Sequence, residues 1–140
     1  VDPYMIYEAK ILGAQGVLLI CSIPTEAEIK SYISLCDMLG LSAMVEVHDE
    51  NEVITALKAG SRVIGVNNRN LKNFSIDTSN SRRLREMIPS DIIFISESGV
   101  TCSEDVEKLR MIGAHAVLIG EALMVAEDKK AKLAELRGGL

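Results

Sequence analysis

Polar side chains capable of acid–base chemistry lie at the ends of short apolar runs in this 140-residue sequence. Glu46 lies within one such run, and Asn67 and Glu97 directly follow two others. A carboxylate in an apolar strand is costly to bury unless it is paired, so its presence indicates a functional site. Partial burial also moves the pKa of a carboxyl group towards neutrality, which suits a general acid or base. The alternative is a glutamate at a strand end that simply reaches solvent.

Two glycine-containing loops suggest a second kind of chemistry. Ser98 and Gly99 follow the fourth apolar run, and Gly120 and Glu121 follow the fifth. Such loops expose backbone N–H groups beside the start of a helix, where phosphate is often bound. A single glycine is more often only a turn residue. Two of them at matched places favour a phosphate site.

Five short runs rich in Val, Ile and Leu are predicted to be the strands that position these residues. They are nearly continuous in apolar character, which is typical of parallel strands covered by helices. The runs are Val17–Cys21, Ala43–Val47, Val63–Val66, Ile92–Ser96 and Val117–Ile119.

Amphipathic segments with helix-terminating signals separate these runs. Three pairs have the spacing of a capping box at a helix start: Thr25 with Glu28, Asp49 with Glu52, and Thr101 with Glu104. Glycines mark the helix ends, directly before the next strand, as expected for residues that adopt the left-handed conformation. They are Gly13, Gly40, Gly60 and Gly113.

A repeated strand–helix unit predicts an α/β fold with a parallel sheet, either open or closed into a barrel. In an open sheet, polar residues would gather at one switch point, whereas here they follow nearly every strand. The sequence therefore favours a (β/α)8 TIM barrel. Five units are present, so we expect a partial barrel with strands four to eight, forming one domain over residues 1–140 around one continuous core.

Composition narrows the range of partners. The 15 basic and 20 acidic residues give a net charge of −5 without basic clusters, which argues against nucleic acid. No apolar run approaches the roughly 20 residues of a membrane span, and no signal peptide is evident. Three scattered cysteines argue against disulfides and a zinc site and favour a reducing, cytoplasmic setting. A small phosphorylated substrate remains compatible with all of this.

The short sequence segments at the ends of the predicted strands, taken in order, resemble the C-terminal part of the indole-3-glycerol-phosphate synthase family over essentially the whole chain. The matching strings are Asp2-Pro3-Tyr4 with Ile6-Tyr7-Glu8-Ala9, Leu18-Leu19-Ile20, Val45-Glu46-Val47-His48-Asp49-Glu50, Ile64-Gly65-Val66-Asn67-Asn68-Arg69-Asn70-Leu71, Ser96-Glu97-Ser98-Gly99, and Leu118-Ile119-Gly120-Glu121-Ala122-Leu123-Met124.

The resemblance implies a carbon–carbon lyase of tryptophan biosynthesis. Such an enzyme closes the ring of 1-(2-carboxyphenylamino)-1-deoxyribulose 5-phosphate to indole-3-glycerol phosphate, losing carbon dioxide and water, without cofactor or metal. By resemblance, Glu46 is the general base, Asn67 orients the substrate and the base, and Glu97 is a second catalytic carboxylate. The implied binding residues are Arg69 near the substrate's anionic groups, Ser98, Gly99, Gly120 and Glu121 at the phosphate, and Leu18 and Leu118 as apolar walls around the aromatic ring.

The sequence also departs from the family. No Lys matches the lysine that acts as general acid on the third strand, and the start at Val1 looks like a cut within a longer chain. We therefore expect negligible activity from this piece alone, and either self-association or a complementing N-terminal part. The alternatives are an inactive half-barrel that binds phosphate or only self-associates, or another phosphate-binding barrel of nucleotide or vitamin metabolism. His48 and His115 are expected to be structural.

Overall fold

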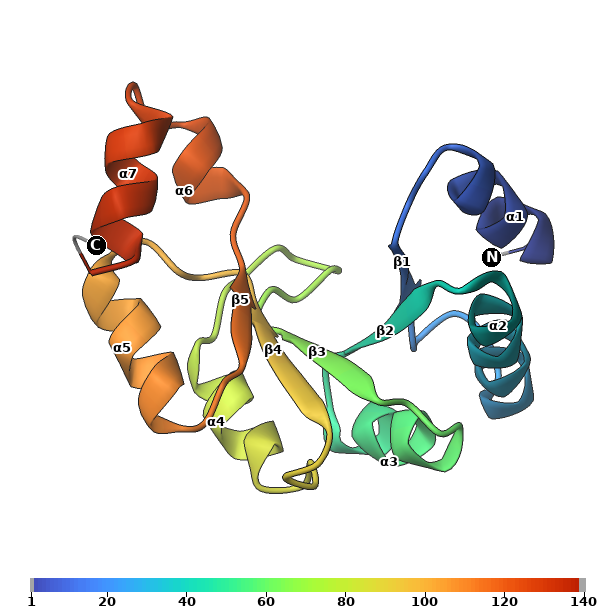
Figure 1. Ribbon diagram of the computed structural model, residues 1–140. Coiled ribbons are helices and arrows are strands. Elements are labelled where there is room, and N and C mark those ends of the chain that lie inside the picture. The colour runs from blue at the N-terminus through green and yellow to red at the C-terminus, as the bar shows by residue number, and fades with distance from the viewer. Residues whose placement is uncertain (1, 139–140) are drawn as a thin grey trace.

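A computed structural model describes residues 2–138 of the chain. Five parallel strands form one sheet in the order β1-β2-β3-β4-β5, so each strand pairs with the next along the chain. The strands follow a curved row, and helices α2 to α5 lie around its outer side (Figure 1). This is a partial α/β barrel, as the sequence predicted. The strands are β1 (Gly16–Ile20), β2 (Ser42–Val47), β3 (Val63–Asn67), β4 (Ile93–Glu97) and β5 (Ala116–Leu118).

Seven helices accompany these strands within the described residues. They are α1 (Pro3–Ile11), α2 (Glu26–Leu39), α3 (Glu50–Lys58), α4 (Ser79–Arg85), α5 (Ser103–Met111), α6 (Glu121–Met124) and α7 (Lys129–Leu136). The four glycines expected at helix ends all have positive φ, between 64° and 86°. None of these helices is long and apolar enough to span a membrane.

The helix starts follow the predicted caps in two of three cases. Thr25 and Glu28 form a full capping box on α2, and the Asp49 side chain accepts a hydrogen bond from the Glu52 N–H on α3. The prediction of Thr101 and Glu104 is wrong by one residue: the N-cap of α5 is Cys102. Asp105 is the reason, because its carboxylate accepts hydrogen bonds from the backbone N–H groups of both Thr101 and Cys102.

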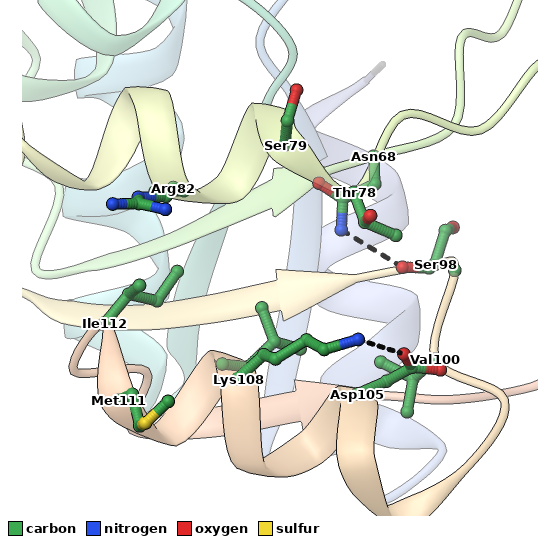
Figure 2. Close-up of a pocket in the computed structure, with 12 residues that line it drawn as sticks. Asn68, Thr78, Ser79, Arg82, Ser98, Val100, Asp105, Lys108, Met111 and Ile112 are labelled. Carbon is green, nitrogen blue, oxygen red and sulfur yellow. Dashed lines mark hydrogen bonds and ion pairs between the residues drawn. The ribbon is translucent and has the colours of Figure 1, made fainter.

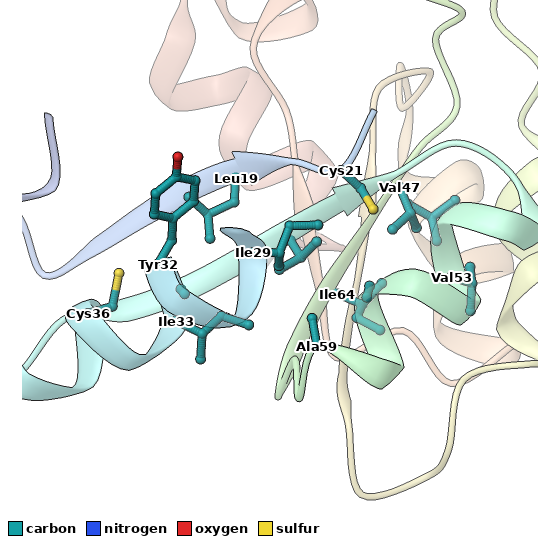
Figure 3. Packing of buried hydrophobic residues seen from close by; sticks show 14 of the residues in the cluster. Leu19, Cys21, Ile29, Tyr32, Ile33, Cys36, Val47, Val53, Ala59 and Ile64 are labelled. Atoms are coloured by element: carbon teal, nitrogen blue, oxygen red, sulfur yellow. The ribbon is translucent and has the colours of Figure 1, made fainter. Parts of the chain in front are cut away.

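Strand alternation divides the sheet into two faces. One row of side chains packs under the helices and is fully buried, forming the main core (Figure 3). Its strand members include Val45, Val47, Ile64, Val66 and Phe94.

The core is not one continuous cluster, contrary to expectation. Val100, Leu109 and Leu136 form a second, smaller cluster, in which α7 packs on α5 and Val117 of the edge strand β5 contributes. Ile112 and Ala114 pack against both clusters and connect them.

The other face of the sheet is the inner face of the curve and carries the candidate chemistry. Register places Ile20, Glu46 and Gly65 in one row across β1, β2 and β3. Asn67 pairs with Glu97 in the next row, towards the C-terminal ends of the strands. Because parallel strands end at the same rim, these polar residues meet at one edge of the sheet.

Candidate active site

Asn67 connects the strand ends of β2 and β3. Its Nδ2 donates to Glu46 Oε1 at 3.1 Å, and its Oδ1 accepts from the backbone N–H of Arg69 at 2.9 Å. Since Arg69 N–H needs an acceptor, the amide nitrogen must face Glu46. Both Asn67 and Glu46 are buried, so this hydrogen bond is shielded from water and fixes the carboxylate.

Glu97 is the second carboxyl of the site and is 3% exposed. Burial, followed by the charge of Glu46 and a hydrogen bond to Glu46, raises the pKa of Glu97 from 4.5 to about 7. No donor among the described residues reaches Glu97 Oε1. Glu97 therefore keeps its proton between about pH 4.5 and pH 7, where an exposed glutamate has already lost it.

Gly65 provides the space in which Glu97 sits. A Cβ built on Gly65 would overlap Glu97 Oε1 and come within 3.0 Å of its carboxyl carbon. The Glu97 side chain thus lies back along its strand over the bare backbone of β3, between the strands that carry it and Glu46. The missing side chain at this position brings the two carboxyl groups together.

His48 lies closer to the site than the sequence suggested. Its Nε2 is 3.4 Å from Glu46 Oε1, without the geometry of a hydrogen bond, and its Nδ1 is 3.3 Å from Glu52 Oε2. Glu52 also accepts from the His48 backbone N–H at 2.7 Å. The period of the strand placed His48 on the same side as Glu46, and this was the available signal. His115, in contrast, is structural as expected, because its Nδ1 accepts from the backbone N–H of Phe94.

Most of the predicted binding residues line one cavity of about 720 Å³, whereas the predicted catalytic residues Glu46, Asn67 and Glu97 are not among the residues that line it. They are Arg69, Ser98, Gly99, Leu118, Gly120 and Glu121. Arg69 forms an ion pair with Glu121, which ties the loop after β3 to the first residue of α6. Arg69 also lines a second cavity with His48 and Asn67, so this residue borders both cavities.

Two further observations concern this cavity. Lys132 of α7 contributes to its lining, and no sequence signal distinguished it from the other lysines of that helix. Leu18 does not belong to it: it lies on β1, the opposite edge of the sheet from β5, and lines a separate cavity against α1. The structure therefore does not bring Leu18 and Leu118 together.

Backbone donors are available at both glycine loops. Within residues 2–138, no hydrogen bond uses the N–H groups of Gly99, Val100, Gly120 or Glu121. Free N–H groups on two neighbouring loops are suited to the oxygens of a phosphate. Among the same residues, no cluster of three or more His, Cys, Asp or Glu side chains is arranged to hold a metal ion.

Comparison with known proteins decides the family. The model of the family described as indole-3-glycerol phosphate synthase matches residues 1–136. The chain belongs to the indole-3-glycerol phosphate synthase family. It is 59% identical over 138 residues to the protein of that name from Ruminiclostridium cellulolyticum and 52% identical to that from Leuconostoc mesenteroides. Each match covers 99% of this chain and 53% of the relative, so the chain spans about half the length of these relatives.

Solved structures show the same fold at low sequence identity. The 3-hexulose-6-phosphate synthase of Salmonella typhimurium superposes with a TM-score of 0.79 at 17% identity, covering 96% of this chain and 66% of that one. A mandelate oxidase mutant superposes with a TM-score of 0.74 at 15% identity, covering 98% and 52%. These similarities support the barrel fold. The carbon–carbon lyase class fits the family of the chain.

Proposed function

We propose that this chain carries the C-terminal share of an indole-3-glycerol phosphate synthase active site. The substrate is 1-(2-carboxyphenylamino)-1-deoxyribulose 5-phosphate, and the products are indole-3-glycerol phosphate, carbon dioxide and water. The observation that carries the proposal is the pair of buried carboxyl groups, with Glu46 fixed by Asn67 and the pKa of Glu97 raised to about 7. Family membership supports the choice of reaction.

The two carboxyl groups carry this chain's share of the proton transfers. Glu46 acts as the general base of the dehydration and takes a proton from the ring-closed intermediate. The proton that converts the leaving hydroxyl group to water comes from the general-acid lysine that the family resemblance places on the third strand, in the part of the relatives that this chain does not cover. Glu97, whose pKa is near neutrality, holds a proton beside it and acts as the second catalytic carboxyl. Asn67 keeps Glu46 in position through the 3.1 Å hydrogen bond and presents its amide to the substrate. None of these steps needs a cofactor or a metal ion.

The cavity lined by the two glycine loops binds the phosphate. Its oxygens accept from the free N–H groups at Gly99 and Gly120, while Ser98 and Glu121 belong to the same two loops. Arg69, whose guanidinium group pairs with Glu121, is proposed to contact the anionic substrate as well, because its planar fork suits a carboxylate or phosphate. Leu118, half-exposed on the inner face, forms an apolar wall for the aromatic ring. Leu18 is proposed as a second wall, on the β1 side of the curve.

The two edges of the sheet are proposed to be contact surfaces. β1 and β5 are the outermost strands, and apolar side chains on their inner faces, Leu18 and Leu118, are 40% and 50% exposed. Unpaired strand edges with apolar neighbours favour association. The partner is either a complementing set of β/α units, as the greater length of the relatives suggests, or a second copy of this chain. We place the activity in the cytoplasm, where three free cysteines stay reduced.

Substitution of Glu46 by Gln in the full-length protein tests the proposed reaction. The variant keeps the size of the side chain and the partner of Asn67 but cannot accept a proton, so turnover should fall by about 10²- to 10⁴-fold. The affinity for substrate should change little. Turnover is measured by the fluorescence of the indole product, and affinity by equilibrium titration.

Two results would count against this assignment. An equal loss of affinity and turnover would make Glu46 a binding residue. Full activity of the variant would remove Glu46 from the mechanism. Glu86→Gln, an exposed carboxylate at the end of α4, serves as the matched control.

A further inference from the structure

A closed ring of hydrogen bonds lies behind the ends of β3 and β4, on the side away from the carboxyl pair. Asn68 Nδ2 donates to Ser96 Oγ at 3.1 Å, and Ser81 Oγ donates to Asn68 Oδ1 at 2.9 Å. The two hydroxyl oxygens are 2.7 Å apart. Since the only proton of the Ser81 hydroxyl is used at Asn68, Ser96 must be the donor between them. Each of the three groups therefore donates to the next.

The Asn68 amide is fully satisfied. Its second N–H donates to the carbonyl oxygen of Ser98 at 3.1 Å, and its Oδ1 also accepts from the backbone N–H of Ser81 at 3.1 Å. Reversing the amide would set NH2 against two donors, so its orientation is determined. Ser81 and Ser96 are completely buried and Asn68 nearly so. A satisfied buried network of this kind makes its surroundings rigid.

The backbone that this network holds is strained. Ser98 has a φ of 66°, in the left-handed region that residues with a Cβ rarely occupy, and Gly99 follows with a φ of 79°. Such a conformation persists only where neighbouring groups enforce it. The Asn68 amide points at the Ser98 carbonyl beside the cavity between α4 and α5 (Figure 2).

The loop after β3 restricts the same turn from another side. A Cβ on Gly99 would come within 2.7 Å of a methyl carbon of Ile76 and 2.8 Å of one of Thr78. That loop is itself anchored at Asn68, whose carbonyl accepts from Asp77 N–H at 2.9 Å. Asn68 therefore acts on the turn directly, through its amide, and indirectly, through the loop.

We propose that Asn68 is a positioning residue for phosphate binding: it holds Ser98 in the left-handed conformation and so sets the free N–H groups of Gly99 and Val100 towards the phosphate. This inference rests on the proposed function for the identity of the ligand. The control of the Ser98 conformation by Asn68 does not depend on any ligand. Asn67 and Asn68 thus divide the work, since Asn67 orients the base on the inner face and Asn68 orients the turn from the outer side.

The conformation of Ser98 is tested without ligand. In Asn68→Ala, the Cα and Cβ chemical shifts of Ser98 should leave the left-handed range, and the amide signals of Ser98 and Gly99 should broaden. Asn73→Ala is the matched control, because Asn73 is exposed and, among residues 2–138, its side chain is hydrogen-bonded to Ser75 and not to Ser98 or Gly99. Ser98 shifts that stay unchanged in folded Asn68→Ala would overturn the inference. Ser96→Ala opens the ring but keeps the amide, and should give a smaller change in the same direction if Asn68→Ala does not fold.

Phosphate affinity gives the second measurement, with inorganic phosphate titrated against the amide signals of the 15N-labelled chain. Asn68→Ala should weaken binding about tenfold, since the turn must then be ordered on binding. In a Ser98→Gly background, where the left-handed conformation carries no Cβ penalty, the same substitution should cost less than about threefold. Equal losses in both backgrounds would reduce Asn68 to a general stabilising residue. If the unsubstituted chain does not bind phosphate but the Ser98 shifts respond as expected, the proposed phosphate site is contradicted. The control of the Ser98 conformation by Asn68 would still be established.

Discussion

Glu97→Gln is expected to flatten the dependence of the stability of this chain on pH. Below about pH 4.5, Glu97 is protonated in both the folded and the unfolded chain. As the pH rises from there, the unfolded chain loses this proton first, which favours unfolding, until the folded carboxyl ionises near pH 7. The contribution of Glu97 to the free energy of unfolding is thus full at acid pH and is lost as the pH rises through about 7.

The magnitude follows from the pKa. The rise from 4.5 to about 7 corresponds to about 3 kcal/mol of the free energy of unfolding at 1.36 kcal/mol per pKa unit. Gln has the shape of the protonated acid and does not ionise, so the variant should lack this loss. The decrease in unfolding free energy between pH 5 and pH 8 should therefore be about 2 to 3 kcal/mol smaller in Glu97→Gln than in the unsubstituted chain.

Urea denaturation followed by circular dichroism at half-unit pH steps measures this difference. Glu86→Gln, which alters an exposed carboxylate, should reproduce the pH dependence of the unsubstituted chain. The same pH dependence in Glu97→Gln and in the control would mean that the folded chain holds the proton of Glu97 no more tightly than the unfolded chain does, contrary to this prediction.

Two further predictions concern the packing at the site and the edges of the sheet. Gly65→Ala should displace the Glu97 carboxylate, because the new Cβ overlaps it, and should lower turnover of the full-length protein at least tenfold. The control Ala59→Gly, at the C-terminal end of α3, should leave turnover nearly unchanged. Retained activity in Gly65→Ala would show that the carboxyl pair tolerates a shift. The chain of residues 1–140 should sediment as a species heavier than its monomer mass of 15.2 kDa, because both edge strands of its sheet are unpaired. A compact 15.2 kDa species would show that the chain does not self-associate through these edges.

The sheet was predictable because each strand buries one face under the helices, and this burial requires an apolar run in the sequence whatever the loops do. Apolar runs located all five strands, with ends that differ by one residue, as at β1, where the strand starts at Gly16 and ends at Ile20. Capping was predictable where only one acidic residue lay at the right spacing, as with Thr25 and Glu28. It failed at α5, where Glu104 and Asp105 compete and the choice depends on where the first helical turn begins.

The composition of the site was predictable in part. The position of Glu46, Asn67 and Glu97 in or directly after apolar runs marked them as candidates, and in the structure all three lie on the inner face of the sheet. The role of Gly65 was not visible in the sequence, because a glycine within a strand does not reveal which side chain from another strand will fill its space. The ring around Asn68 likewise joins residues 13 and 28 positions apart, and no local pattern reports such distances.

The two adjacent asparagines after β3 have a consequence for redesign of this barrel. Asn67 lies on the inner face and is bonded to Glu46 and to the Arg69 backbone, so a substitution there acts first on the carboxylate of the candidate site. Asn68 faces the scaffold with every polar atom occupied, and a library that randomises both positions together would discard most members for misfolded turns before any new activity could be selected. A deletion or insertion of one residue in β3 would exchange the two amides between faces, so length changes are better placed in the loop that follows.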